Sequence, residues 1–252
     1  MLNIDLSNKV AVVTGATGAL GRVMARTLAQ AGADVAIHFY QNEAMAGQLA
    51  AELRDMGRRS LTIQADVTDQ GSVNAMRDAV VKGLGPADII VNNAVIQYKW
   101  VHVLDQDPAD YESQFNSCVL HNLYMVKAFV PAMVERGWGR VIGINTECAM
   151  QAFVSQSAYV AGKRGMDGLL RVLAKEVGAQ GVTVNQVAPG WTISDKSQAG
   201  QNDENYRVKV PMQRRGTDQE IANAVVFLAS DLASYITGVY LPVCGGTVMP
   251  AI

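Results

Sequence analysis

The sequence predicts an α/β fold: a single doubly wound parallel sheet of about seven strands with helices on both faces. Three observations predict it. Short apolar runs rich in β-branched residues recur along the chain, amphipathic stretches separate them, and several runs are apolar throughout instead of alternating. Strands buried on both faces of a parallel sheet show such continuous runs, and a regular alternation of strands and helices favours the doubly wound arrangement.

Seven segments are expected as strands and six as helices. The expected strands are Val10–Thr14, Asp34–Phe39, Ser60–Asp66, Asp88–Asn92, Gly139–Asn145, Val182–Ala188 and Tyr240–Val243. The expected helices are Ala19–Ala31, Glu43–Met56, Asp69–Lys82, Pro108–Glu135, Ser155–Gly178 and Asp218–Ser230. The fourth helix is long enough to contain a break. Thr68 is expected to cap the third helix, and Gly57 to lie just past the end of the second.

Length and composition bound the class of protein. The chain has 252 residues, of which 49% are hydrophobic and 17% charged, and its formal net charge is -2. An α/β chain of about 250 residues forms one domain with a large buried core, so residues 1–252 are expected to be a single domain. Because acids balance the lysines and arginines, nucleic-acid binding is not expected.

Further features indicate a cytoplasmic protein without a metal site. No uninterrupted apolar run approaches the ~18–20 residues of a membrane helix, and residues 1–10 lack the basic and apolar regions of a signal peptide. Cys118, Cys148 and Cys244 are far apart and odd in number, which is typical of reduced intracellular thiols. No set of histidines, cysteines and acids has metal-ligand spacing.

The stretch Gly190–Asp218 interrupts the alternation of strands and helices. It is polar, with few apolar residues and no periodicity. A long irregular insert in a compact domain is usually a lid over a binding site or a disordered loop. We favour a substrate lid at about residues 190–218, with the part from Asp203 to Arg215 closing over the substrate.

A glycine-rich turn, Thr14–Gly21, follows the first expected strand. Its glycines stand where the strand turns into a helix, whose first N–H groups are unpaired and whose N-terminus is the positive end of the helix dipole. Without β-carbons the backbone can approach a pyrophosphate closely, which favours a dinucleotide cofactor over a purely structural turn. The expected cofactor contacts in this turn are Gly15, Thr17, Gly18, Leu20 and Gly21.

The end of the second strand bears on the choice of cofactor. NAD sites usually place an acid there to hold the ribose 2′-hydroxyl. Residues 38–42 read His-Phe-Tyr-Gln-Asn, with no acid before Glu43, and Tyr40 is the expected cofactor contact. A local arginine for the 2′-phosphate of NADP is also missing, and the candidates for that charge are Arg22, Arg54 and Arg58. NADP(H) is favoured, and NAD(H) stays open as the alternative.

Tyr159 and Lys163 are four residues apart on an expected helix. At this spacing two side chains share a face, with Cβ atoms about 5–6 Å apart. A nearby ammonium favours the phenolate and is expected to lower the pKa of Tyr159 from ~10. Such a tyrosine can exchange a proton with a carbonyl or alcohol oxygen while hydride moves at carbon. By itself, the pair also fits an ordinary solvated helix surface.

Several motifs occur together and in order. They are Thr14–Gly21, Asn92-Asn93-Ala94, Tyr159-x-x-x-Lys163, Asn185-x-x-x-Pro189-Gly190, Pro211–Gly216, Tyr235–Gly238 and Gly245-Gly246. Together they resemble the short-chain dehydrogenase/reductase family from about Leu6 to Gly246, and within it 3-oxoacyl-acyl-carrier-protein reductases and related sugar or polyol dehydrogenases. The resemblance implies a Rossmann-like fold, NAD(P)H-dependent oxidoreduction of a small-molecule carbonyl or secondary alcohol, and a homotetramer paired through the helices at 108–135 and 155–178.

The resemblance also implies roles for individual residues. Tyr159 would be the general acid/base, Lys163 would lower its pKa and hold the nicotinamide ribose, and Thr146 would replace the family's serine in orienting the substrate oxygen. Cys118 stands at the family's fourth catalytic position, an asparagine whose backbone carbonyl is linked to a proton-relay water. The implied cofactor contacts are Asp66 and Val67 beside adenine, Asn93 and Ala94 beside its ribose, and Pro189, Gly190 and Thr192 on the nicotinamide side.

Four positions depart from the family's pattern. Ala19 replaces the middle glycine of the turn, and Val95 replaces a glycine where a branched side chain restricts the backbone beside the cofactor. At Cys118 a buried, inert thiol is favoured over a reactive one, and Cys244, in place of an aspartate, is interpreted as structural. These departures motivate the alternative function, a non-catalytic dinucleotide-binding regulator or scaffold.

The segments 95–107 and 150–156 follow expected strand ends, where ligand crevices of open α/β sheets lie. No acidic or basic cluster indicates a charged substrate. The candidates for a partly aromatic pocket are Tyr98, Trp100, His102, Phe153 and Trp191. For each of them, loop packing or a subunit contact is the alternative, and His102 is expected to be a packed or surface residue instead of a catalytic one.

Overall fold

The computed structural model describes residues 4–194 and 204–250. Its main sheet has seven parallel strands in the order β3-β2-β1-β4-β5-β6-β9. The strands are β1 (Val10–Val13), β2 (Asp34–Phe39), β3 (Ser60–Gln64), β4 (Ile89–Asn92), β5 (Gly139–Ile144), β6 (Val182–Pro189) and β9 (Tyr240–Val243). This order, which runs outward in both directions from β1 and β4, confirms the predicted doubly wound sheet.

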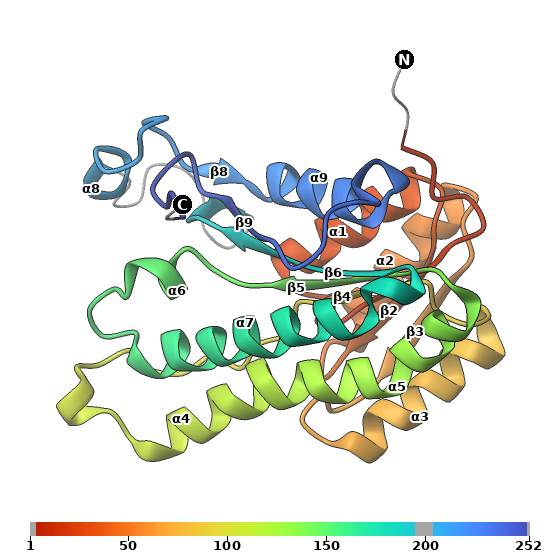
Figure 1. Cartoon of the computed structure of the whole chain (residues 1–252), viewed down its shortest axis with the longest axis horizontal. Coiled ribbons are helices and arrows are strands. Elements are labelled where there is room, and N and C mark those ends of the chain that lie inside the picture. Colours follow the sequence, from red (N-terminus) through yellow and green to blue (C-terminus); the bar gives the residue numbers. More distant parts are fainter. Residues whose placement is uncertain (1–3, 195–203, 251–252) are drawn as a thin grey trace.

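Helices cover both faces of the sheet (Figure 1). One face carries α1 (Ala19–Gln30), α2 (Glu43–Asp55) and α9 (Asp218–Ala229), and the other carries α3 (Gln70–Gly83), α5 (His121–Arg136) and α7 (Ser157–Val177). Strand β1 shows why its run is apolar throughout: Ala11 and Val13 enter the first core, whereas Val10 and Val12 enter the second. Alternate side chains of a strand point to opposite faces, and each face of this sheet is covered by a buried apolar cluster.

The long helix expected at 108–135 is broken. It consists of α4 (Pro108–Gln114), a π-helical turn (Phe115–Leu120) and α5. Helix α7 approaches the break so closely that a Cβ on Gly162 would come within 2.8 Å of the Gln114 carbonyl oxygen. By length and composition the run Pro108–Arg136 could cross a membrane, but more than half of its most apolar window is buried in the fold.

Smaller elements complete the described chain. The expected insert contains β7 (Thr192–Ile193), which pairs with β8 (Gly216–Thr217), and the short helix α8 (Glu204–Arg207). Helix α6 (Cys148–Gln151) was not expected, and neither were the 3-10 turns Val103–Asp105, Gly178–Gln180 and Asp231–Ala233. The expected cap of α3 was wrong by one residue: the Asp69 carboxylate, not Thr68, accepts the N–H of Ser72.

The chain segments that carry the candidate site leave the sheet at one edge. They follow the carboxyl ends of β1, β4, β5 and β6, at Thr14, Asn93, Asn145 and Gly190 respectively. In an open α/β sheet the ligand crevice lies at this edge, beside the point where the strand order reverses. The topology therefore brings residues that are up to 176 positions apart in the sequence to one place.

Candidate active site

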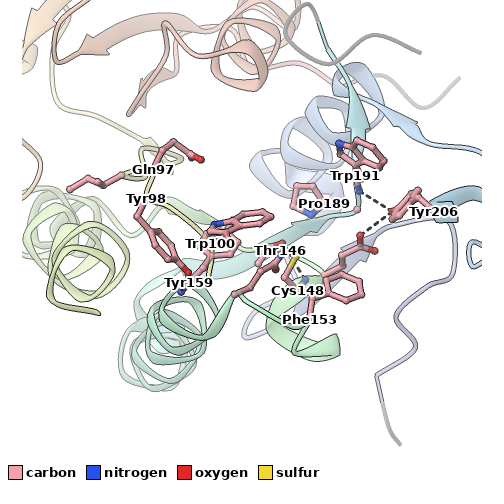
Figure 2. A pocket seen from close by; sticks show the side chains of 14 residues that line it. Gln97, Tyr98, Trp100, Thr146, Cys148, Phe153, Tyr159, Pro189, Trp191 and Tyr206 are labelled. Atoms are coloured by element: carbon pink, nitrogen blue, oxygen red, sulfur yellow. Dashed lines mark hydrogen bonds between the residues drawn. The ribbon is translucent and has the colours of Figure 1, made fainter. Parts of the chain in front are cut away.

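A cavity of about 470 Å³ opens beside Thr146 and Tyr159 (Figure 2). Its wall includes residues from the loops after β4, β5 and β6 and from helices α6, α7 and α8. The lining residues are Ile96, Gln97, Tyr98, Trp100, Thr146, Glu147, Cys148, Phe153, Gln156, Tyr159, Pro189, Gly190, Trp191 and Tyr206. The structure thus brings together four of the five expected pocket aromatics, whereas His102 is exposed and outside this lining.

Tyr159 lies in the first turn of α7 and is half-buried. Its backbone N–H donates to the hydroxyl of Tyr98 at 2.9 Å, and its ring stacks on Trp100 with 6.4 Å between the centroids. Loss of solvent raises the pKa of Tyr159, and its hydrogen bond with the Thr146 side chain opposes that rise. A tyrosine in this environment holds its proton, as a proton donor to a carbonyl oxygen must.

Lys163 shares the face of α7 with Tyr159, and its ammonium lies 5.7 Å from the centre of the tyrosine ring. The side chain is buried, and the ammonium donates to the carbonyl oxygen of Ile144 at 2.6 Å. Burial lowers the pKa of Lys163. The expected lowering of the Tyr159 pKa is wrong for this geometry, because desolvation of the phenol dominates while the ammonium is engaged by a carbonyl.

Thr146 is held by its neighbours just past the end of β5. Its backbone N–H donates to the Asn145 side chain at 2.9 Å, and its hydroxyl accepts the N–H of Cys148 at 3.2 Å. The hydroxyl of Tyr240 donates to its backbone carbonyl. Because the Thr146 oxygen already accepts one bond, its own proton can be directed toward the Tyr159 oxygen or toward a substrate oxygen.

Cys118 lies in the π-helical turn and is 1% exposed, so its thiol does not line either the substrate or the cofactor cavity. Its backbone carbonyl accepts a hydrogen bond of 2.7 Å from the side chain of Asn122, whose oxygen in turn accepts from Asn92 at 2.8 Å. A carbonyl oxygen has two lone pairs, so this carbonyl can accept one further bond.

Glu147 directly follows Thr146 and was missed by the sequence analysis. It is 3% exposed, and its carboxylate accepts hydrogen bonds from the hydroxyls of Tyr206, at 3.0 Å, and Thr247. The Tyr206 hydroxyl also accepts the N–H of Trp191 at 2.9 Å (Figure 2). Burial raises the pKa of Glu147, and both hydroxyls counteract this rise. The only sign in the sequence that Glu147 belongs to the site was its position next to Thr146, whose hydroxyl was expected to orient the substrate.

A second cavity extends along the glycine turn at the N-terminus of α1. Gly15 has φ +62°, and a Cβ on Gly21 would collide with the Gly15 carbonyl oxygen, so neither position accepts a side chain easily. No acid stands in the first turn of α1. The lining of this second cavity includes the expected contacts Gly15, Thr17, Gly18, Leu20, Gly21, Tyr40, Asp66, Val67, Asn93 and Ala94.

His38 also lines this second cavity and fixes the glycine turn. Its Nδ1 accepts the N–H of Gly15 at 2.9 Å, so Nε2 carries the proton and donates to the Ala65 carbonyl at 3.0 Å. Burial lowers the pKa of His38, which keeps the imidazole neutral. Sequence reasoning treated this histidine only as part of the strand end.

The end of β2 presents uncharged side chains to the second cavity, namely Tyr40, Gln41 and Asn42. The three arginines considered for the 2′-phosphate are outside that lining. Arg22 donates to the Thr17 carbonyl, Arg54 to Ser60, and Arg58 to the Gly32 carbonyl. The two departures in this region, Ala19 and Val95, both line the cavity.

Of the remaining expected contacts, two line the substrate cavity and one lines neither cavity. Pro189 and Gly190 line the cavity of Thr146 and Tyr159, on the side toward β6. Thr192 lines neither cavity, because its hydroxyl donates to the Asp218 carboxylate at 2.7 Å. Of the expected lid at about 190–218, residues 195–203 lie outside the described residues.

Comparisons with known proteins agree with this geometry. Residues 15–248 match the family model described as Enoyl-(Acyl carrier protein) reductase. The chain is 36% identical to the 3-oxoacyl-[acyl-carrier-protein] reductase of Escherichia coli, over 98% of this chain and 100% of the relative. It is also 36% identical to Nodulation protein G of Azospirillum brasilense, over 96% of this chain and 98% of the relative. The chain belongs to the short-chain dehydrogenase/reductase family.

Solved structures of similar chains support the same assignment. A blue fluorescent protein from a metagenomic library, crystallised with NADPH, superimposes with a TM-score of 0.91 at 33% identity, over 97% of this chain and all of that one. A double mutant of a Serratia marcescens short-chain dehydrogenase/reductase gives a TM-score of 0.90 at 29% identity, over 96% of this chain and 98% of that one. As a short-chain dehydrogenase/reductase, the chain is an NAD(P)H-dependent oxidoreductase of carbonyl or alcohol substrates.

Proposed function

We propose that Tyr159 and Thr146 act together on one substrate oxygen in this short-chain dehydrogenase/reductase. Their side chains line one cavity, and this single observation carries the proposal. Thr146 directs its proton to the substrate oxygen, and Tyr159 donates a proton to that oxygen on reduction or removes it on oxidation. A bound nicotinamide cofactor supplies or accepts the hydride at the carbon atom.

The glycine turn fits a dinucleotide. Gly15 and Gly21 leave no room for a β-carbon, the first turn of α1 carries no acid, and its unpaired N–H groups favour a pyrophosphate. Gly15, Thr17, Gly18, Leu20 and Gly21 would hold the pyrophosphate side. Asp66, Val67, Asn93 and Ala94 would flank the adenosine, and Lys163, Pro189, Gly190 and Thr192 the nicotinamide side.

NADP(H) is the favoured cofactor, with NAD(H) as the alternative. The end of β2 offers Tyr40, Gln41 and Asn42 and no carboxylate that would repel a 2′-phosphate. The similar blue fluorescent protein was crystallised with NADPH, which supports the same choice. Titration of both reduced cofactors by nicotinamide fluorescence tests it: NADPH should bind more tightly, and a tenfold preference for NADH, about 1.4 kcal/mol, would overturn it.

Lys163 and Cys118 have supporting roles in the proposal. The buried ammonium of Lys163, on the same helix face as Tyr159, would hold the nicotinamide ribose. The backbone carbonyl of Cys118 would take the place of the family asparagine's carbonyl in the proton relay, and the Asn122 amide bound to it would fix its orientation. The relay depends on the backbone and not on the thiol.

At the level of the whole protein, we propose one cytoplasmic oxidoreductase domain over residues 1–252 with a substrate lid at about 190–218. The proposed assembly is a homotetramer paired through α4–α5 and α7. Phe115 and Val172 on these helices are more than half exposed, which supports burial against another subunit. All three cysteines are free in the structure, in keeping with a reducing compartment.

An assay of NADPH oxidation against a panel of ketones and 3-oxoacyl thioesters tests the proposed chemistry. Replacing Tyr159 by Phe should lower kcat by about 100-fold or more, because general acid catalysis contributes about that much. Cofactor binding to the variant should be retained. Equal inertness of wild type and Tyr159→Phe, with cofactor still bound, would instead favour the alternative, a non-catalytic dinucleotide-binding regulator or scaffold.

A further inference from the structure

Aromatic side chains form two opposed walls of the substrate cavity (Figure 2). Tyr98 and Trp100 stand with Tyr159 on one side, and Phe153, Trp191 and Tyr206 stand on the other, with Thr146 between them. Trp100 is 50% exposed, Trp191 37% and Phe153 36%. Rings of this size gain stability when they leave water, so their open faces form a surface suited to an apolar, flat ligand.

Contacts behind the walls hold several of the rings in place. The Tyr98 hydroxyl is bound to the backbone of Tyr159, and Trp100 stacks on the Tyr159 ring with an interplanar angle of 24°. On the other side Trp191 meets Tyr206 edge-on, at 5.4 Å and 88°, and its ring lies 4.0 Å from the guanidinium carbon of Arg215. Walls that are fixed before binding lose little freedom when a ring enters between them.

The charges of the cavity disfavour anions. Among the residues that the structure describes, its lining contains no lysine or arginine and one acid, Glu147. The two hydroxyls that donate to Glu147, from Tyr206 and Thr247, are both occupied by that carboxylate. A second negative group placed here would find no cationic side chain in the described lining and would be repelled by Glu147.

We propose that the substrate is an uncharged ketone, or the corresponding secondary alcohol, that carries an aromatic ring. The inference rests on the proposed function, because it places the carbonyl oxygen at Thr146 and Tyr159. The ring then lies between the aromatic walls, and Glu147 excludes ketones that carry a carboxylate. This substrate class differs from the 3-oxoacyl-[acyl-carrier-protein] in the names of similar reductases.

Matched ketones test the requirement for a ring. 4-Phenyl-2-butanone and 4-cyclohexyl-2-butanone have the same skeleton, and neither ring is conjugated with the carbonyl group. We expect kcat/KM to be about two- to twelvefold higher for the phenyl compound, because aromatic pairs contribute about 0.5–1.5 kcal/mol beyond the area that they bury. Equal or reversed values would overturn the proposed aromatic substrate.

A second pair tests the exclusion of anions. 4-(3-Oxobutyl)benzamide and 4-(3-oxobutyl)benzoate differ in charge but hardly in size, and the amide should have at least a tenfold higher kcat/KM. Glu147→Gln keeps the shape of the side chain and should reduce this ratio while leaving the phenyl-to-cyclohexyl ratio unchanged. An unchanged amide-to-carboxylate ratio in Glu147→Gln would overturn the role of Glu147.

Variants of the walls complete the test. Trp100→Leu and Phe153→Leu should each reduce the phenyl-to-cyclohexyl ratio, whereas Leu104→Ala, at a side chain that is 97% exposed and outside the cavity, should leave it unchanged. A ratio measured on one preparation does not depend on how much of the protein is folded. If the enzyme prefers the cyclohexyl compound to the phenyl compound, or the carboxylate to the amide, the proposed substrate class is overturned but the proposed function is not. Inertness toward all four ketones and 3-oxoacyl thioesters would overturn the proposed function with it.

Discussion

At the scale of single residues, Thr146 and Tyr159 illustrate how the backbone prepares a reactive pair. Thr146 is oriented by Asn145 and Cys148, and the backbone of Tyr159 is bound by Tyr98, so few rotations remain to be lost when a substrate binds. The Tyr159-x-x-x-Lys163 motif indicated Tyr159, and the family resemblance implied Thr146. The acid at Glu147, whose partners Tyr206 and Thr247 are 59 and 100 residues away, could not be connected to them without the fold.

Cys118 provides a prediction at the same scale. Because its thiol is buried against the side chain of Gln114 and lines neither cavity, Cys118→Ala should keep kcat within about twofold of wild type. Iodoacetamide should modify native Cys148, which lines the cavity and is less buried, before Cys118 or Cys244. Mass spectrometry of tryptic peptides measures the order. A tenfold loss of kcat in Cys118→Ala would show that the thiol itself takes part.

At the scale of elements, the glycine turn determines where the cofactor can bind. A Cβ on Gly21 would collide with the Gly15 carbonyl oxygen and lie 2.9 Å from the Cα of Ala16. Gly21→Ala should therefore open the turn and raise the Kd for NADPH at least tenfold, with a loss of stability of about 1–3 kcal/mol. Fluorescence titration and urea unfolding measure the two effects.

Gly47 is the matched control for that variant. It lies on the exposed side of α2, and a Cβ there would meet nothing within 4 Å. Gly47→Ala should leave the Kd for NADPH unchanged and stabilise the protein by about 0.5–1 kcal/mol, because alanine favours the helix. Tight NADPH binding by Gly21→Ala would contradict the assignment of the turn.

Elements that depend on local pattern could be predicted from the sequence, and elements that depend on tertiary contacts could not. The seven strands of the main sheet were predicted from their apolar runs, and the alternation with helices predicted that the sheet is parallel and doubly wound. The π-helical turn at Phe115–Leu120 lacks a local signal, since it forms where α7 packs against the chain at Gly162. The β7–β8 pair joins segments that the sequence shows only as polar.

At the scale of the whole molecule, buried histidines couple the stability of the protein to pH. His121 is fully buried beside the cofactor segment, and desolvation lowers its pKa to about 3. The unfolded chain, with a histidine pKa of ~6.5, binds this proton first as the pH falls. Stability is therefore complete above about pH 6.5 and is lost progressively below it, by about 1.4 kcal/mol per pH unit for this one proton.

Urea unfolding between pH 7 and pH 5 measures this effect. From His121 alone, the free energy of unfolding should fall by about 2 kcal/mol between pH 6.5 and pH 5. The glutamine of His121→Gln does not titrate, so the free energy of unfolding of this variant should depend on pH less steeply, by the uptake of about one proton. His38, whose pKa is also lowered by burial, should account for part of the dependence that persists. Identical pH profiles for wild type and His121→Gln would contradict a neutral, buried imidazole.

The central claim is direct hydride transfer to a carbonyl carbon whose oxygen is bound by Thr146 and protonated by Tyr159. Reduction of a ketone with NADPH that carries deuterium at both C4 positions of the nicotinamide tests it most directly. We expect one deuterium on the carbinol carbon of each product molecule, measured by mass spectrometry, and no product from Tyr159→Phe on the same timescale. A carbinol carbon without deuterium would contradict the account.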